Sequence, residues 1–119
     1  MQIKTASLIV NPCDDEYDNM ALLCCHSEHG ELFSLSRFPD EDEVEITVHD
    51  DKTHTVSTLT VTLSAERLLL EIDPADGKQL DGHQRYEILH STSAGELPEV
   101  EETLQIILKN VGSYISELA

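Results

Sequence analysis

The stretch VEITVHDDKTHTVSTLTVTLSAERLLLEI, residues 44–72, decides the fold of this chain. In its first five residues, Val or Ile alternates with Glu or Thr, which is the period of a half-buried β-strand. After a polar turn, the β-branched run Thr55–Leu63 predicts a second strand, in which Val56 lies out of phase and indicates a bulge. A tight turn then leads into a third strand, Arg67–Ile72. Successive strands joined by short turns predict an antiparallel meander.

The residues before this stretch predict three more strands. Gln2–Val10 is rich in β-branched residues, and Asn11-Pro12 is expected to end it. The short run Met20–His26 is apolar at nearly every position, which predicts a strand buried on both faces. Glu31–Arg37 alternates and is expected to pair with it as a hairpin, because the connection is short and contains Gly.

The residues after it predict a loop at Asp73–Gly82, a strand at Arg85–His90 and a helix. Apolar residues recur with helical spacing and form one stripe: Val100, Leu104, Ile107, Leu108, Val111, Ile115 and Leu118. Pro98 fits the first turn, so the helix is expected over Pro98 to Ile115. The predicted fold class is α+β, an antiparallel β-meander of six to seven strands with one C-terminal amphipathic helix packed on the sheet. Residues 1–119 are expected to form a single domain.

The charge of the chain limits the choice of partners. Its 119 residues carry 24 acidic and 7 basic side chains, for a formal charge of −17. Nucleic acids and anionic membranes are therefore excluded as default partners, and a protein with a basic face is favoured. Three cysteines, no export signal and no transmembrane stretch favour a cytoplasmic protein without a disulfide framework.

Three groups of side chains have the chemistry of metal ligands, but their spacing favours structural roles. In the segment Cys24–His29, two adjacent cysteines on a strand would point to opposite faces and cannot easily share one ion. His49 and His54 flank a predicted hairpin turn, where solvated histidines are common, and the aspartates of residues 73–81 lack the alternation of an EF-hand loop. The chain has no nucleophile elbow, phosphate loop or His-Glu-x-x-His motif. We therefore expect no catalytic residue, no metal, no cofactor and no enzymatic activity.

Two acidic loops are the candidate binding site. Each has an aromatic residue in it or next to it, and charge around an aromatic anchor is common at protein interfaces. The predicted partner-binding residues are Asp14, Asp15, Glu16, Tyr17, Asp18, Phe38, Asp40, Glu41, Asp42 and Glu43. The alternative is that both clusters are simply solvated loops, as charge runs usually are.

Part of the sequence resembles the tenth immunity-protein family of bacterial polymorphic toxins. The resemblance covers the strand Leu32–Arg37, the acidic segment after it, the hairpin Leu59–Ile72, and the closing helix with its apolar stripe. Here the strand ends in Leu-Ser-Arg, where the family tends toward Leu-Gln-Arg. The resemblance implies a cytoplasmic immunity protein, or antitoxin, that serves in bacterial competition as a toxin inhibitor. It would bind its cognate toxin domain stoichiometrically and carry no catalytic residues.

Two other classes of binding protein remain open on the sequence. An acidic chaperone or adaptor for a secreted effector would have the same size and charge, but such proteins normally dimerise through apolar patches. A nucleic-acid mimic would space its carboxylates like phosphates over a whole face. A measured oligomeric state would help to separate the first of these from an immunity protein.

Overall fold

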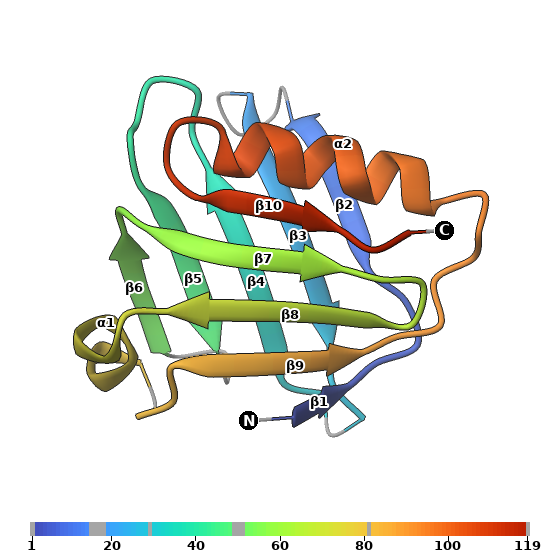
Figure 1. Ribbon diagram of the computed structural model, residues 1–119, viewed down its shortest axis with the longest axis horizontal. Coiled ribbons are helices and arrows are strands. Elements are labelled where there is room, and N and C mark those ends of the chain that lie inside the picture. The colour runs from blue at the N-terminus through green and yellow to red at the C-terminus, as the bar shows by residue number, and fades with distance from the viewer. Residues whose placement is uncertain (1, 15–18, 29, 49–51, 81, 119) are drawn as a thin grey trace.

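The computed structural model describes residues 2–14, 19–28, 30–48, 52–80 and 82–118, with the backbone alone at residues 12–14. Ten strands in these residues form two five-stranded sheets, which lie one behind the other in Figure 1. The front sheet contains, in spatial order, β1 (Gln2–Lys4), β9 (Arg85–Leu89), β8 (Arg67–Ile72), β7 (Leu59–Leu63) and β10 (Ser113–Ser116). The back sheet contains β2 (Ile9–Asp14), β3 (Met20–His26), β4 (Leu32–Arg37), β5 (Val44–Val48) and β6 (Lys52–Val56).

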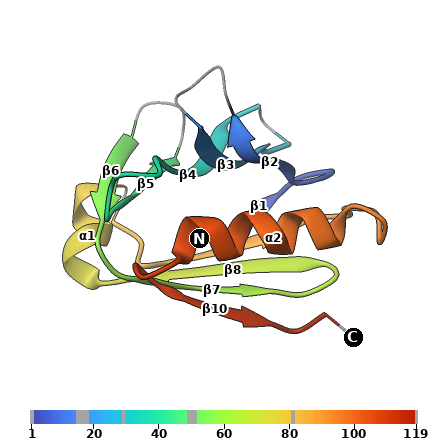
Figure 2. The ribbon, with the colours of Figure 1, turned by 90° about the horizontal axis from the view of Figure 1, so that it is seen from above.

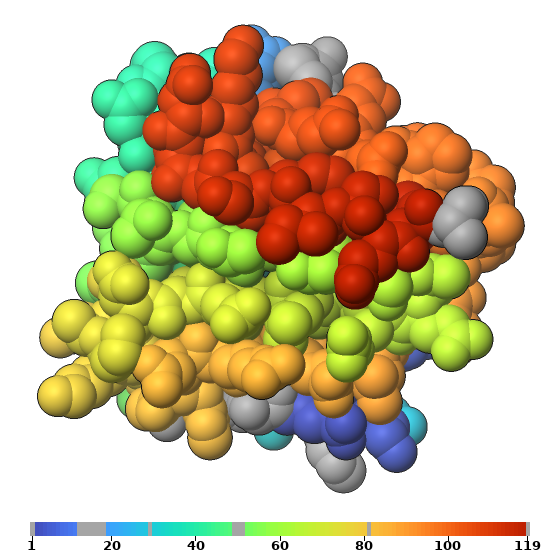
Figure 3. All heavy atoms as spheres, viewed as in Figure 1, coloured from blue at the N-terminus to red at the C-terminus, as the bar shows by residue number. Residues whose placement is uncertain are grey.

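The two sheets differ in topology. The back sheet is a continuous antiparallel meander, as the sequence predicts. The front sheet has an antiparallel centre of β7, β8 and β9, with β1 added parallel to β9 and β10 added parallel to β7. Its outer face, with β10, β7, β8 and β9 as adjacent bands, faces the viewer in Figure 3. The α+β class with a C-terminal helix is confirmed, but the described residues hold ten strands in two sheets rather than six or seven in one.

Two segments expected as single strands are each divided between the sheets. Thr55–Leu63 breaks between β6 and β7, where the chain crosses from the back sheet to the front sheet. Val56 is out of phase because it points into the core from the back sheet, whereas Leu59 and Val61 point into it from the front. Gln2–Val10 divides in the same way, with β1 in front and the start of β2 behind. The bulge predicted at Val56 and the long strand predicted at Gln2–Val10 are therefore both places where the chain crosses from one sheet to the other.

An aliphatic core fills the space between the sheets. Its fully buried members come from both sheets and from the C-terminal helix, and the largest include Leu23, Leu35, Ile46, Leu63, Leu68, Leu70, Ile88, Leu104 and Ile107. Two aromatic rings join them: Phe33 of the back sheet meets Tyr86 of the front sheet with ring centroids 5.8 Å apart. Because both sheets contribute to one core, they are held together by the same buried apolar surface.

The C-terminal helix α2 (Leu97–Leu108) lies between the two sheets along their open side (Figure 2). Its predicted stripe is buried from Val100 to Val111, but the helix ends at Leu108 instead of Ile115. Asn110 has a φ of 62°, and the chain then turns into β10 along the edge of β7. Gly112 permits this turn, since a Cβ there would lie 2.4 Å from the Leu59 carbonyl oxygen. Strand pairing thus replaces the last helical turns and leaves Ile115 48% exposed.

Two smaller expectations also need correction. The segment expected as a loop contains the short helix α1 (Pro74–Gln79), which packs beside β6. Asn11-Pro12 does not end the first strand of the back sheet, because β2 continues to Asp14 with a register shift between Asn11 and Asp14. A proline is tolerated there because β2 is an edge strand and the shift relieves the missing donor. Neither helix in the described residues is long and apolar enough to cross a membrane.

Candidate functional site

The connection between β4 and β5 carries one of the two acidic segments. The chain passes the half-buried ring of Phe38 and turns where the Glu41 N–H donates to the Phe38 carbonyl oxygen at 3.2 Å. The four acidic side chains that follow Pro39 are all exposed: Asp40, Glu41, Asp42 and Glu43. In the described part of the chain, none of these carboxylates pairs with a Lys or Arg. They therefore present a local concentration of negative charge to solvent.

Arg37, the cation nearest to this segment in sequence, is committed to the main chain. Its Nε donates to the Glu41 carbonyl oxygen at 3.1 Å, which holds the acidic turn in place. Its Nη1 donates to the carbonyl oxygens of Ile107, at 3.2 Å, and of Lys109. These carbonyls belong to the C-terminal end of α2, where the helix leaves acceptors unsatisfied and where positive charge is favourable. One guanidinium thus joins the end of β4, the acidic turn and the end of the helix.

The structure brings the ends of the two acidic loops to the same edge of the back sheet. Ala21 pairs with Arg37, so the start of β3 lies beside the end of β4. Asn19, Phe38, Asp40 and Glu41 line an open pocket of about 500 Å³ at this edge. The predicted binding residues Asp15, Glu16, Tyr17 and Asp18 lie outside the described residues, and only the backbone of Asp14 is described. Their part in the site stays a prediction.

The thiols of the described cysteines are poorly suited to metal binding or nucleophilic chemistry. Cys25 points into the core, while Cys24 is on the opposite face and half-buried, as strand geometry predicts. Burial, with the Cys24 thiol adding to it, raises the pKa of Cys25 to about 11 against a lowering hydrogen bond from Thr5, and burial also raises the pKa of Cys24. Both groups are therefore protonated at neutral pH. Among the described residues, no three His, Cys, Asp or Glu side chains lie close enough together to hold a metal ion.

The sequence suggested that His54 is at a solvated hairpin end, and the structure shows instead that its side chain contacts α1. Its Nε2 lies 3.0 Å from Oδ1 of Asp76, so β6 is tied to α1 by this pair. His49, the other histidine of the proposed hairpin site, lies outside the described residues, as do Asp81 and His29. The sequence missed this contact because Asp76 is on an element that was expected to be a loop.

His90 is a buried polar residue that the sequence analysis did not single out. Its Nδ1 lies 2.9 Å from the Thr92 hydroxyl and accepts from the Thr92 N–H at 3.3 Å, while the Leu8 N–H donates to the same hydroxyl at 3.0 Å. Nδ1 is thus an acceptor, which assigns the proton to Nε2, an atom buried without a hydrogen-bond partner among the described residues. Burial lowers the pKa of His90, and the nearby carbonyls of Ser64 and Arg67 oppose this without meeting hydrogen-bond geometry at Nε2.

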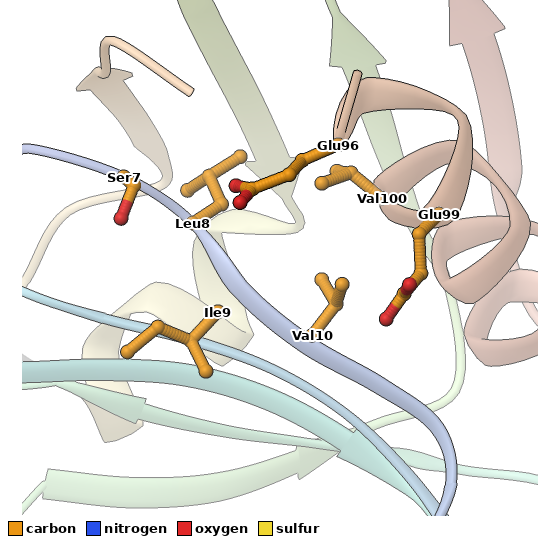
Figure 4. A pocket seen from close by; sticks show the side chains of 7 residues that line it. All are labelled: Ser7, Leu8, Ile9, Val10, Glu96, Glu99 and Val100. Atoms are coloured by element: carbon orange, nitrogen blue, oxygen red, sulfur yellow. The ribbon is translucent and has the colours of Figure 1, made fainter. Parts of the chain in front are cut away.

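Two other hollows were not predicted either. One of about 710 Å³ is lined by His90 together with Lys4, Glu28 and Glu66. The other, of about 310 Å³, lies between the start of β2 and the N-terminal turn of α2. Figure 4 shows Leu8 and Val10 on the pocket side of the chain and Ile9 extending to the other side. The carboxylates that line this pocket, Glu96 and Glu99, are at the N-terminal end of α2, where negative charge is favourable. Their position therefore has a structural explanation.

Comparison with known proteins adds no assignment. No protein-family model matches the chain, and no curated protein or solved structure matches it either. The resemblance to the tenth immunity-protein family therefore depends on the residues quoted above alone.

Proposed function

We propose that this chain is an immunity protein, a non-enzymatic cytoplasmic antitoxin that neutralises a cognate bacterial toxin domain by stoichiometric binding. The observation that carries the proposal is the exposed acidic turn Asp40–Glu43, which no described Lys or Arg neutralises. The turn has a defined shape because Arg37 fixes its main chain to the end of α2. A fixed group of like charges beside a half-buried aromatic ring suits a partner with a basic face.

The physical advantage of this arrangement is the rate of association. Complementary charge can raise association rate constants to about 10⁸ M⁻¹s⁻¹ or more at low salt, compared with about 10⁵–10⁶ M⁻¹s⁻¹ for neutral surfaces. A cell that makes a toxin beside its inhibitor needs fast capture. The chain's formal charge of −17 acts in the same direction at long range, and the turn concentrates it at one edge.

Growth rescue tests the proposal. The C-terminal domain encoded by the reading frame adjoining this chain's gene is induced in a bacterial host, alone and together with this chain. We expect the domain to be basic and to arrest growth alone, and we expect this chain to restore growth and to copurify with it in a one-to-one complex. Growth arrest that this chain does not relieve, or an adjoining domain that is neither basic nor toxic, contradicts the proposal.

Charge neutralisation tests the role of the acidic turn. One variant replaces the four carboxylates by amides: Asp40→Asn, Glu41→Gln, Asp42→Asn and Glu43→Gln. The matched control neutralises four exposed carboxylates elsewhere: Glu71→Gln, Asp73→Asn, Glu102→Gln and Glu117→Gln. At low ionic strength we expect the first variant to bind the toxin domain at least about tenfold more slowly than the control, with a flatter salt dependence. Equal association rates for the two variants would show that the turn is only solvated.

A further inference from the structure

The outer face of the back sheet carries almost no charge among its described side chains. The strand register places one set of side chains on this face, opposite the core: Ile9, Asn11, Met20, Leu22, Cys24, His26, Leu32, Ser34, Ser36, Glu45, Thr47, Thr53 and Thr55. Among the side chains that the structure describes on this face, one is a carboxylate, Glu45, and none is Lys or Arg. In a chain with 26% charged residues, this face is a nearly neutral region of apolar and hydroxyl side chains.

Nothing in the described chain covers this face. The helix α2 packs against β2, β3 and β4 from the side of the core, and α1 lies at the edge strand β6. Figure 2 shows α2 and the front sheet on one side of the back sheet and no described helix or strand on the other. Ile9 is 53% exposed and Leu22, Cys24 and Leu32 are half-buried, whereas the small side chains of Ser34 and Ser36 on the central strand are buried. An antiparallel sheet that faces water normally carries polar side chains at such positions.

The sequence of β3 also indicates that this face is covered by something. Its run of apolar residues on both faces predicts a strand covered on both sides. The structure supplies one cover, because Ala21, Leu23 and Cys25 are buried in the core. The other face, with Met20 and Leu22, is only partly removed from water. No described helix or strand covers that face, which makes it a candidate contact surface for another molecule.

Charge at the rim indicates the kind of molecule. Asp40–Glu43 is at one end of these strands, and Glu28 and Glu31, both exposed, are in the β3–β4 turn at the other end. A neutral centre with a charged rim is the usual anatomy of a protein interface. The Asp40–Glu43 end of the rim is acidic and complements a basic surface, while the other end also carries the exposed Lys4 and Lys52. A second copy of this chain that docked through the acidic end would bring like charges against each other.

We propose that the outer face of the back sheet is the surface on which the basic toxin domain docks. This rests on the proposed function and adds the contact surface to it. The acidic turn Asp40–Glu43 would guide the encounter, while the apolar side chains of Ile9, Leu22 and Leu32 would make the lasting contact. Removing this contact should therefore speed dissociation more than it slows association.

A matched pair of double-lysine variants tests the surface. The test variant is Ile9→Lys with Thr47→Lys, two positions in one row across the outer face of the back sheet. The control is Ile115→Lys with Thr62→Lys, two adjacent positions on the outer face of the front sheet. The isoleucines are similarly exposed, at 53% and 48%, and both threonines are half-buried. Each variant changes the net charge equally, so long-range attraction is matched.

The probe is the toxin domain from the adjoining reading frame, with surface binding and growth rescue as the readouts. We expect the test variant to bind at least about 100-fold more weakly, mostly through faster dissociation, and the control to stay within about threefold of wild type. Circular dichroism and thermal melting show whether both variants fold. Thr55→Lys, at an exposed position on the same face, is a milder third variant that should also weaken binding.

The outcomes separate the two proposals. If wild type neutralises the toxin domain and the test variant does so equally well, the docking surface is wrong and the proposed function stands. If wild type neither binds nor neutralises the domain, the proposed function fails and the docking surface falls with it. If wild type sediments as a dimer that the test variant converts to a monomer, a second copy occupies this face and the basic partner is wrong.

Discussion

The outer faces of the two sheets differ sharply in charge. On the front sheet, Lys4, Arg67, Glu71, Arg85 and Glu87 share the outer face with hydroxyl and apolar side chains. Two of them pair directly: Nη1 of Arg67 lies 3.1 Å from a carboxylate oxygen of Glu87. Among the described side chains, the outer face of the back sheet has a single carboxylate, that of Glu45. Charged side chains are thus concentrated on the outer face of the front sheet rather than on that of the back sheet. On the front sheet, acidic and basic side chains partly neutralise each other.

The pKa of Glu87 shows how the front face is arranged. A hydrogen bond from Gln2, at 2.8 Å, and then the hydrogen bond and charge of Arg67 lower the pKa of Glu87 below its usual range. The stabilisation from this carboxylate is present above its ordinary pKa of about 4.3 and is lost as the pH falls through the lowered value. Among the described residues, no ion pair between charged side chains lies on the outer face of the back sheet, which agrees with the proposal that a partner docks there.

The largest expected loss of stability comes from replacing Arg37, and replacing Arg67 is the comparison. Arg37→Met should lower the free energy of unfolding by about 3 kcal/mol, because it removes charge-assisted hydrogen bonds to carbonyls at the end of α2 and in the acidic turn. Arg67→Met should cost much less, since its pair with Glu87 is exposed. Urea unfolding of both variants measures the difference. Equal losses would mean that Arg37 is no more than a surface charge.

A second pair of variants separates stability from binding on the two outer faces. Leu69, on the front sheet, is only 8% exposed, so Leu69→Ala should cost about 2 kcal/mol of unfolding free energy. Leu22, on the back sheet, is half-buried, and Leu22→Ala should cost about 1 kcal/mol of unfolding free energy while weakening binding to the proposed toxin partner. Chemical denaturation and surface binding are the two measurements. If Leu69→Ala weakens binding more than Leu22→Ala, the assignment of the faces is reversed.

Most strands were predictable from the sequence, while the division into two sheets was not. Met20–His26 is a strand where its apolar run predicted one, and Val44–Val48 is a strand where its alternation predicted one. Val56 showed that something changes after β6, but a phase shift has the same appearance in a bulge and in a change of sheet. The helix was predicted too long because Val111 and Ile115 continue its spacing, while Gly112 and the free edge of β7 act through tertiary contacts.

The candidate site was predictable only in part. The exposed acidic turn Asp40–Glu43 follows from composition, because consecutive charges cannot be buried. The use of Arg37 by the end of α2 joins residues about seventy positions apart in the chain, and no local pattern signals it. The neutral back face had a signal, the run of apolar residues on both faces of β3, but it could be interpreted only once the structure left one face uncovered.

A third prediction concerns the junction between the sheets. His90 follows β9 of the front sheet, and through Thr92 it is joined to Leu8, just before β2 of the back sheet. Burial lowers the pKa of His90 against the opposing effects of nearby carbonyls and Glu66, so the folded chain binds a proton less readily than the unfolded chain. Stability should therefore fall as the pH drops from 7.5 through the unfolded pKa of about 6.5 toward the lowered folded value.

Urea unfolding between pH 7.5 and 5.5 tests this prediction, with His90→Asn as the comparison. The variant should show a flatter dependence on pH in that window, whatever its absolute stability. Lys4 and Glu28 line the same hollow as His90. Glu28→Gln is therefore a control for the electrostatic effect of these neighbouring charges on the pH profile. If wild type and His90→Asn have parallel pH profiles, His90 is not the group that titrates.

The smallest expected effect concerns β10, the edge strand that carries Ile115 on the front face. Tyr114 points the other way, and its hydroxyl donates to Oε2 of Glu101 on α2 at 2.8 Å.

Burial, and then this carboxylate, raise the pKa of Tyr114 to about 12, so the stabilisation is complete below pH 10 and is lost as the pH rises toward 12. Tyr114→Phe should cost about 1 kcal/mol at neutral pH, since one half-exposed hydrogen bond to a charged group is lost. Adding Glu101→Gln should cost less than the sum of the two single changes, because both remove this bond, although Glu101 also interacts with Ser116. Denaturation of the two single variants and the double variant gives the coupling energy, and fully additive losses would contradict a stabilising bond between Tyr114 and Glu101.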